Sequence, residues 1–174
     1  MTERQVLPWL IGQSPLGDHL LELGAGPGAA TAELRHRVPR VTSFDFDHTF
    51  AESLHSRLAN DGISVLQADA ARLPFPDRSF SSAIAMLMLH HLKTPEQQNS
   101  AFSEVLRVLR PGGVFLALEI QNSWFNRFIH LHSTFVPVTP ATANARLTAA
   151  GFWRVTVDIR GSAFRLRALR SWDN

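Results

Sequence analysis

The sequence predicts a single-domain α/β fold, residues 1–174, in which helices cover both faces of a doubly wound parallel sheet. Three observations support this prediction. Short apolar segments alternate with segments of helical spacing along most of the chain. A glycine-rich turn, Gly24–Gly28, follows the first apolar segment and opens a helix. Near the end of the chain, two strand-like segments flank a short turn, which predicts a closing hairpin.

Five segments are predicted as strands because each is short and is either rich in β-branched residues or continuously apolar. They are Leu20–Leu23, Val41–Phe46, Ile63–Gln67, Phe80–Leu87 and Val114–Ile120. The closing hairpin comprises Phe152–Ile159 and Ala163–Leu169, joined by Arg160-Gly161-Ser162. Strand–helix–strand repeats make right-handed crossovers, so we expect ligands to bind at the carboxyl ends of the strands.

Helices are predicted between these strands, where apolar residues recur at helical spacing. The segments are Ala29–Val38, Thr49–Asn60 and Pro95–Leu109, and a fourth helix, Ala141–Ala150, is closed by Gly151. The helix from Pro95 has both boundaries in its sequence, because Thr94 is a good N-cap and Pro111-Gly112-Gly113 follows its end.

The composition excludes several kinds of chemistry. With no cysteine in the chain, there can be no disulfide, cysteine-ligated zinc, iron–sulfur cluster or thiol nucleophile. The first 20 residues lack the features of a secretory signal, and the apolar run Ala83–Leu89 is far shorter than the roughly 20 residues of a membrane-spanning helix. We therefore expect a soluble, cytoplasmic protein.

The charge pattern does not favour a nucleic-acid partner. The pI is near 10.3 although the net charge is only +2, because all but one of the 17 basic residues are arginines. Arginines are frequent after residue 150, but their spacing at Arg165 and Arg167 is typical of the solvent face of a strand.

The glycine-rich turn predicts a cofactor site. Gly24 permits a tight turn, Gly26 and Gly28 leave the backbone accessible, and the helix that follows offers unpaired N–H groups. Asp45 ends the second strand about 20 positions beyond Gly24, where a carboxylate can accept both hydroxyls of a ribose. The pattern therefore predicts a cofactor that contains adenosine.

Three further motifs follow in order: Gln67-Ala68-Asp69-Ala70, then Leu89-His90-His91-Leu92, then Glu104 to Gly113. With the glycine turn, this set resembles the class I S-adenosylmethionine-dependent methyltransferases, particularly the type 11 group. The resemblance covers residues 17–120 and returns at 147–152. It implies a Rossmann-like sheet of order 3-2-1-4-5-7-6 with strand seven antiparallel. It also implies methyl transfer from S-adenosyl-L-methionine to an O, N or C atom of a small organic acceptor.

The resemblance implies a role for each residue that matches a family motif. Two groups of residues would bind the methionine part, and a third would bind the adenosine part. The first is the cradle of Gly24, Ala25, Gly26 and Gly28, with Glu22 beside it. The second is Ala85 and Met86, which would present backbone to the methionyl ammonium. In the third, Asp45 would hold the ribose, Phe46 would pack on the adenine, and Asp69 with Ala70 would meet the adenine edge.

The sequence departs from the family pattern at three places. Ser43 stands where relatives often have Gly, and Ser81 where they often have Asp; both positions are predicted to be structural. Only residues 3–11 could form a helix before the first strand, where many relatives have a longer cap. We therefore expect a pocket that is open, covered by a homodimer or partner subunit, or suited to a bulky substrate.

Candidates for catalysis follow the fourth strand. The imidazole of His90 or His91 could take a proton from a hydroxyl or ammonium acceptor, and His91 is favoured, while one ring could instead fasten the loop. The segment Trp124–His132 is either an acceptor-recognition element or a core stripe. Its histidines lack the spacing of a metal site, so no metal is expected.

Two other functions compete with methyl transfer. Gly24, Gly26 and Ala29 also satisfy the G-x-G-x-x-A pattern of nicotinamide-dependent oxidoreductases, but Gly28, Asp69 and the closing hairpin oppose that reading. A non-catalytic methyltransferase-like module, which binds cofactor or supports a partner subunit, is kept open by the short N-terminal segment.

Overall fold

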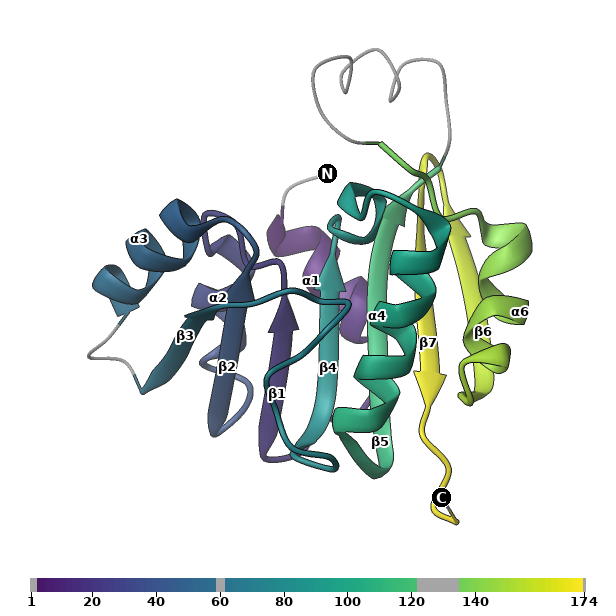
Figure 1. Ribbon diagram of the computed structural model, residues 1–174, viewed down its shortest axis with the longest axis horizontal. Coiled ribbons are helices and arrows are strands. Elements are labelled where there is room, and N and C mark those ends of the chain that lie inside the picture. Colours follow the sequence, from purple (N-terminus) through teal and green to yellow (C-terminus); the bar gives the residue numbers. More distant parts are fainter. Residues whose placement is uncertain (1–2, 59–61, 122–134, 174) are drawn as a thin grey trace.

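The computed structural model describes residues 3–58, 62–121 and 135–173, and their seven strands form one sheet (Figure 1). The strand order is β3-β2-β1-β4-β5-β7-β6, which confirms the predicted order. The strands are β1 (His19–Leu23), β2 (Arg40–Asp45), β3 (Ile63–Gln67), β4 (Phe80–Met86), β5 (Leu109–Ile120), β6 (Trp153–Arg160) and β7 (Ala163–Leu169).

Strand direction places the site. β1 pairs in parallel with β2 and β4, β2 with β3, and β4 with β5. β7 lies antiparallel between β5 and β6, as the closing hairpin predicted. The carboxyl ends of β1 to β5 therefore meet at one edge of the sheet, at the top of Figure 1.

Helices cover both faces of the sheet. One face carries α4 (Pro95–Val108) and α6 (Pro140–Ala149), and the other carries α1 (Glu3–Ile11), α2 (Ala29–Leu34) and α3 (His48–Leu58), as Figure 1 shows. A short 3₁₀ helix, η2 (Leu89–His91), follows β4. None of the described helices is long and apolar enough to cross a membrane.

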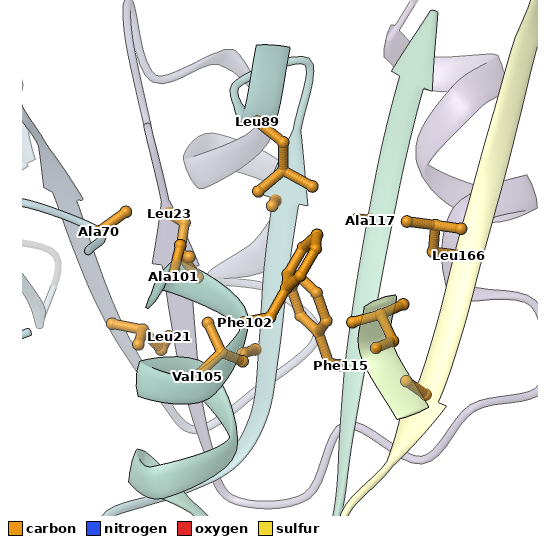
Figure 2. Packing of buried hydrophobic residues seen from close by; sticks show 14 of the residues in the cluster. Leu21, Leu23, Ala70, Leu89, Ala101, Phe102, Val105, Phe115, Ala117 and Leu166 are labelled. Atoms are coloured by element: carbon orange, nitrogen blue, oxygen red, sulfur yellow. The ribbon is translucent and has the colours of Figure 1, made fainter. Parts of the chain in front are cut away.

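Two apolar clusters, one on each face, hold the helices to the sheet. Beneath α4, Phe102 and Phe115 lie with ring centroids 6.4 Å apart (Figure 2). Phe115 also stacks on Phe152 at 5.8 Å. The three rings are almost completely buried. On the opposite face, Leu7 and Leu10 of α1 pack into a second buried cluster. The strands are thus buried on both sides, which explains their nearly continuous apolar sequences.

Two predicted boundaries were wrong by four or more residues. α2 ends at Leu34 rather than Val38, because the N–H groups of His36 and Arg37 donate to carbonyls three residues back, so the backbone leaves the α-helix in a tight turn. β5 begins at Leu109, directly after α4, so Arg110–Gly113 lies within the strand instead of forming a separate turn. Pairing between β4 and β5 shifts register at this point, which accommodates the two glycines.

The expectation that Arg165 and Arg167 face solvent was also wrong. Both lie on the face of β7 that carries α1, and both are partly buried. The Arg165 guanidinium donates to the Trp9 carbonyl and, at 2.9 Å, to Asp158. Arg167 donates to the hydroxyl of Ser14 at 3.0 Å. These arginines fasten α1 and the turn after it to the sheet.

Phe102→Ala should lower the free energy of unfolding by about 3–5 kcal/mol, because it removes a fully buried ring between α4 and the sheet. Urea denaturation measures the change. Ser100→Ala, an exposed change on the same helix, should shift stability by no more than about 0.5 kcal/mol. Equal losses in the two variants would contradict the assigned packing.

Candidate functional site

A cavity of about 680 Å³ opens at the carboxyl ends of the parallel strands, where the sequence predicted a site. Its volume lies within the range of about 300–1,000 Å³ that is usual for small-molecule sites. The walls come from five parts of the chain: the glycine turn, the end of β2, the loop after β3, the loop after β4 and the start of α4. These include Gly24–Pro27, Asp45–Asp47, Asp69–Ala70, Met86–Met88, His91–Lys93 and Gln97.

The glycine turn contributes backbone to this cavity. Gly24, Ala25 and Gly26 line it. Gly26 has a φ of +50°, and a Cβ on this residue would meet no atom within 4 Å, so its backbone faces open space. Gly28 differs, because it does not line the cavity. With a φ of +82°, it begins α2, and a Cβ there would lie 2.1 Å from Leu54 of α3. Gly28 thus allows two helices to approach closely.

Glu22 lies beneath the turn and is almost completely buried. Its Oε2 accepts hydrogen bonds from the hydroxyls of Thr31 and Ser43, each at 2.6 Å. Burial raises the pKa of Glu22 to about 7, although these two hydrogen bonds oppose the shift and the nearby charge of Asp45 adds to it. Ser43, a departure from the family pattern, therefore joins β2 to the carboxylate that supports the turn.

Asp45 joins the end of β2 to the glycine turn. Its Oδ2 accepts from the backbone N–H of Gly26 at 2.8 Å, and its Oδ1 accepts from that of Asp47 at 2.9 Å. Phe46 lines the same cavity with 68% of its surface exposed. An acid and an exposed aromatic ring thus lie side by side on the cavity wall.

Asp69 and Ala70 line the cavity from the loop after β3. The carboxylate of Asp69 accepts from the N–H of Ala71 at 2.8 Å, which closes a local turn. The loop is held from α4. Glu104 accepts from the N–H of Leu73 at 2.7 Å. Arg107 pairs with Glu104 at 2.7 Å and donates to the carbonyls of Leu73 and Phe75.

The end of β4 and the residues after it form another wall. Met86 lines the cavity, whereas Ala85 is fully buried and is not part of the lining. Leu87 follows with a φ of +55°, rare for a residue with a side chain, and it is 42% exposed beside the cavity. The backbone turns sharply here, where β4 gives way to η2.

The two histidines lie in different environments. His91 is exposed and lines the cavity. His90 is buried and lies outside the lining, and its Nδ1 is 2.5 Å from Oε2 of the buried Glu119. The ring centroids of His90 and His91 are 4.2 Å apart. Of the two candidate bases, His91 is therefore the one beside the cavity.

Several lining residues were missed by the motif-based prediction: Val6, Phe50, Leu92, Lys93, Gln97 and Leu118. Lys93 had one overlooked signal, because it is the only lysine in the chain and lies two residues after the His-His pair. Trp124–His132, predicted to recognise an acceptor or to form a core stripe, lies outside the described residues. Within the part of the chain that the structure describes, no group of three His, Asp or Glu could hold a metal.

The comparison with protein families decides the family. The family model described as "Methyltransferase domain" matches residues 21–117, more than half of the chain. The chain belongs to this methyltransferase family. The match begins in β1 and ends in β5, so it spans all five wall segments named above, while two further lining residues, Val6 and Leu118, fall outside it. The resemblance predicted from the motifs is thereby confirmed.

Similar proteins include a demethylmenaquinone methyltransferase from Clavibacter sepedonicus, 35% identical over 59% of this chain and 41% of that protein. Two solved structures share the fold. A Haloferax volcanii methyltransferase in complex with the Trm112 activator gives a TM-score of 0.77 at 18% identity, covering 95% of this chain and 88% of that one. A Haemonchus contortus phosphoethanolamine N-methyltransferase in complex with S-adenosyl-L-methionine gives a TM-score of 0.80 at 14% identity, covering 97% of this chain and 52% of that one. The chain spans 41–60% of the length of its first curated relatives.

Glu22→Gln should flatten the pH dependence of stability. The unfolded carboxyl ionises near pH 4.5 and the folded one near 7, so the native state holds an extra proton between these values and loses stability as pH rises. The loss in the free energy of unfolding that this pKa shift causes is about 3 kcal/mol. It is absent below pH 4.5 and complete above pH 7.

Urea unfolding at several pH values measures this effect. His19 works in the opposite direction over part of the range, because burial lowers its pKa, so the variant must be compared with the wild type at each pH. The stability of Glu22→Gln relative to wild type should rise between pH 4.5 and 8. Parallel curves would contradict the assigned burial of an ionisable group.

Proposed function

We propose that this chain is an S-adenosyl-L-methionine-dependent methyltransferase that acts on a small organic acceptor. The observation that carries the proposal is the meeting of the glycine turn, Asp45 and Asp69 in one cavity of about 680 Å³. Membership of the methyltransferase family supports it. The same membership and the antiparallel β7 oppose the nicotinamide-dependent alternative.

The residues in the cavity fit this cofactor. The open space above Gly26 suits close approach of the methionine part to backbone. Asp45 and the exposed ring of Phe46 would hold the ribose and the adenine, and the carboxylate of Asp69 would accept from the adenine amine. Met86 and Leu87 would present backbone on the opposite wall. When bound, S-adenosyl-L-methionine supplies an electrophilic methyl carbon on a sulfonium.

The chain's own contribution to methyl transfer is mainly alignment and exclusion of water. In-line displacement gains most from fixed geometry, so few catalytic side chains are needed. The apolar side chains of Met88, Leu92 and Leu118 line the cavity and would exclude water from the acceptor. For an acceptor that must lose a proton, an imidazole nitrogen of His91 would take it, because His91 is the histidine beside the cavity.

The cavity wall favours an acceptor with an apolar body and an ionisable hydroxyl, the chemistry of a hydroquinone. Val6, Phe50, Leu87 and Leu92 supply apolar surface, and His91 supplies a base. The Clavibacter relative is a demethylmenaquinone methyltransferase, which supports this class of acceptor.

Two exposed apolar side chains of the cavity lining, Phe46 and Phe50, also suit coverage by a second subunit. The Haloferax neighbour was solved with an activator protein.

Binding of S-adenosylhomocysteine to two glycine variants tests the cofactor site. Gly26→Ala adds a methyl group in open space on a residue that lines the cavity, so it should weaken binding at least about tenfold while costing about 1–2 kcal/mol of stability from backbone strain. Gly28→Ala has the same kind of strain plus a clash with Leu54, so it should lose more stability. Calorimetry and urea unfolding measure both quantities. Wild-type affinity in Gly26→Ala would overturn the cofactor assignment.

Transfer of a labelled methyl group tests the activity. The wild-type chain, with labelled S-adenosylmethionine, should methylate members of a panel of hydroquinones and other small hydroxyl compounds. His91→Gln should reduce kcat about 100-fold, the usual scale for losing a general base, and leave S-adenosylhomocysteine affinity unchanged. Label that appears only in RNA or protein would refute the acceptor class. Binding without turnover on any acceptor would favour the non-catalytic module.

A further inference from the structure

A buried carboxylate lies behind the loop that carries His91. Glu119, near the end of β5, is completely buried, and its carboxylate contacts η2, the short helix after β4. Its Oε1 accepts from the N–H of Leu89 at 2.7 Å, and its Oε2 lies 2.5 Å from Nδ1 of His90. Both oxygens of one side chain therefore hold successive residues of η2. One carboxylate thus contacts both the backbone and the ring of this short helix.

A second buried polar side chain holds η2 from the opposite direction. Gln98 of α4 is fully buried, and its amide nitrogen donates to the carbonyls of Leu89 and Val136 at 3.0 and 2.7 Å. The N–H of Val136 in turn donates to the carbonyl of His90 at 2.8 Å. The short helix is thus fixed by groups from β5, from α4 and from the segment that precedes α6.

These contacts determine where the His91 ring lies. His91 follows His90 directly, its ring is 4.2 Å from the His90 ring between centroids, and the planes are tilted by 44°. The Glu119 contact fixes which way the His90 ring faces, and the aromatic ring of Phe135 packs on it edge-to-face at 5.4 Å. The His90 ring is therefore a rigid support against which the exposed His91 ring rests beside the cavity.

We propose that Glu119 is a positioning residue for the acceptor side of the cavity: acting through His90, it holds η2 and the His91 ring in place. The catalytic consequence rests on the proposed function, because it takes His91 to be the base that faces the acceptor. The structural consequence does not. Glu119 is not among the residues that line the cavity, so it would not contact the cofactor itself.

Three variants test this role. Glu119→Leu removes both hydrogen bonds at similar size. Glu119→Gln retains an oxygen for the N–H of Leu89 and an amide that can donate to His90 in its other tautomer. Glu104→Gln is the matched control, because Glu104 also accepts a backbone N–H, that of Leu73, but supports the opposite wall of the cavity.

Nuclear magnetic resonance of the whole chain gives the decisive readout. The wild type should show a nuclear Overhauser effect between the His90 and His91 rings, assigned with single histidine variants. Glu119→Leu should abolish this effect and shift the Leu89 amide, Glu119→Gln should retain it, and Glu104→Gln should leave it unchanged. An unchanged effect in Glu119→Leu would overturn the proposal. If Glu119→Leu does not fold, a wild-type His90 ring spectrum in Glu119→Gln would overturn it, because the Gln amide can donate to Nδ1 of His90 only when the ring adopts its other tautomer.

Activity and binding separate this proposal from the proposed function. With an acceptor that the wild type methylates, Glu119→Leu should lower kcat about 100-fold, because His91 is misplaced. The affinity for S-adenosylhomocysteine should stay at the wild-type value. Glu119→Gln should recover most of the loss. Glu104→Gln should instead weaken S-adenosylhomocysteine binding. A wild-type chain that does not bind S-adenosylhomocysteine would refute the proposed function alone, because the ring-to-ring effect would still report the positioning by Glu119.

Discussion

The hydrogen bond from the Gly26 N–H to the Asp45 carboxylate is the contact on which the site depends most. It ties the turn after β1 to the end of β2, so the open backbone of the turn and the acidic wall face the same space. A neighbouring bond from the Ala25 N–H to the Phe44 carbonyl extends the sheet pairing into the turn. Because Gly26 has positive φ, the bond holds a backbone conformation that most residues disfavour. Local sequence and long-range contact therefore cooperate at this point.

Two walls of the cavity are each supported by a glutamate that does not line it. Glu104, paired with Arg107, holds the loop of Asp69 by accepting a backbone N–H. Glu119, paired with His90, does the same for η2. In both cases the carboxylate comes from an element about 30 residues further along the chain, and it accepts a backbone N–H from the loop after β3 or from η2. The loops after β3 and β4 form walls of the cavity, and these two glutamates hold those loops in place.

The sequence predicted the fold and most of the cavity lining because those features follow from local patterns. Parallel strands are continuously apolar, and turns require glycine, so β1, β2 and the Gly24–Gly28 turn were recognisable. The contacts that hold the cavity walls in place could not be recognised from local sequence patterns. Glu119 is a charged residue within the apolar strand β5, a visible anomaly, but its partner His90 could be named only once β4 and β5 lay side by side. The orientation of Arg165 depended likewise on where α1 packs.

Lys93 gives the cavity an unusual chemical handle. As the single lysine of the chain, it carries the only ε-amino group, and it is one of the residues that line the cavity. Amine-directed dyes will therefore label the mouth of the cavity and, apart from the N-terminal amine, nowhere else. A fluorophore attached there would respond to ligands that enter. For the same reason, amine coupling to a biosensor surface would turn the cavity toward the support and obstruct it, so attachment through a terminal tag is the sound choice.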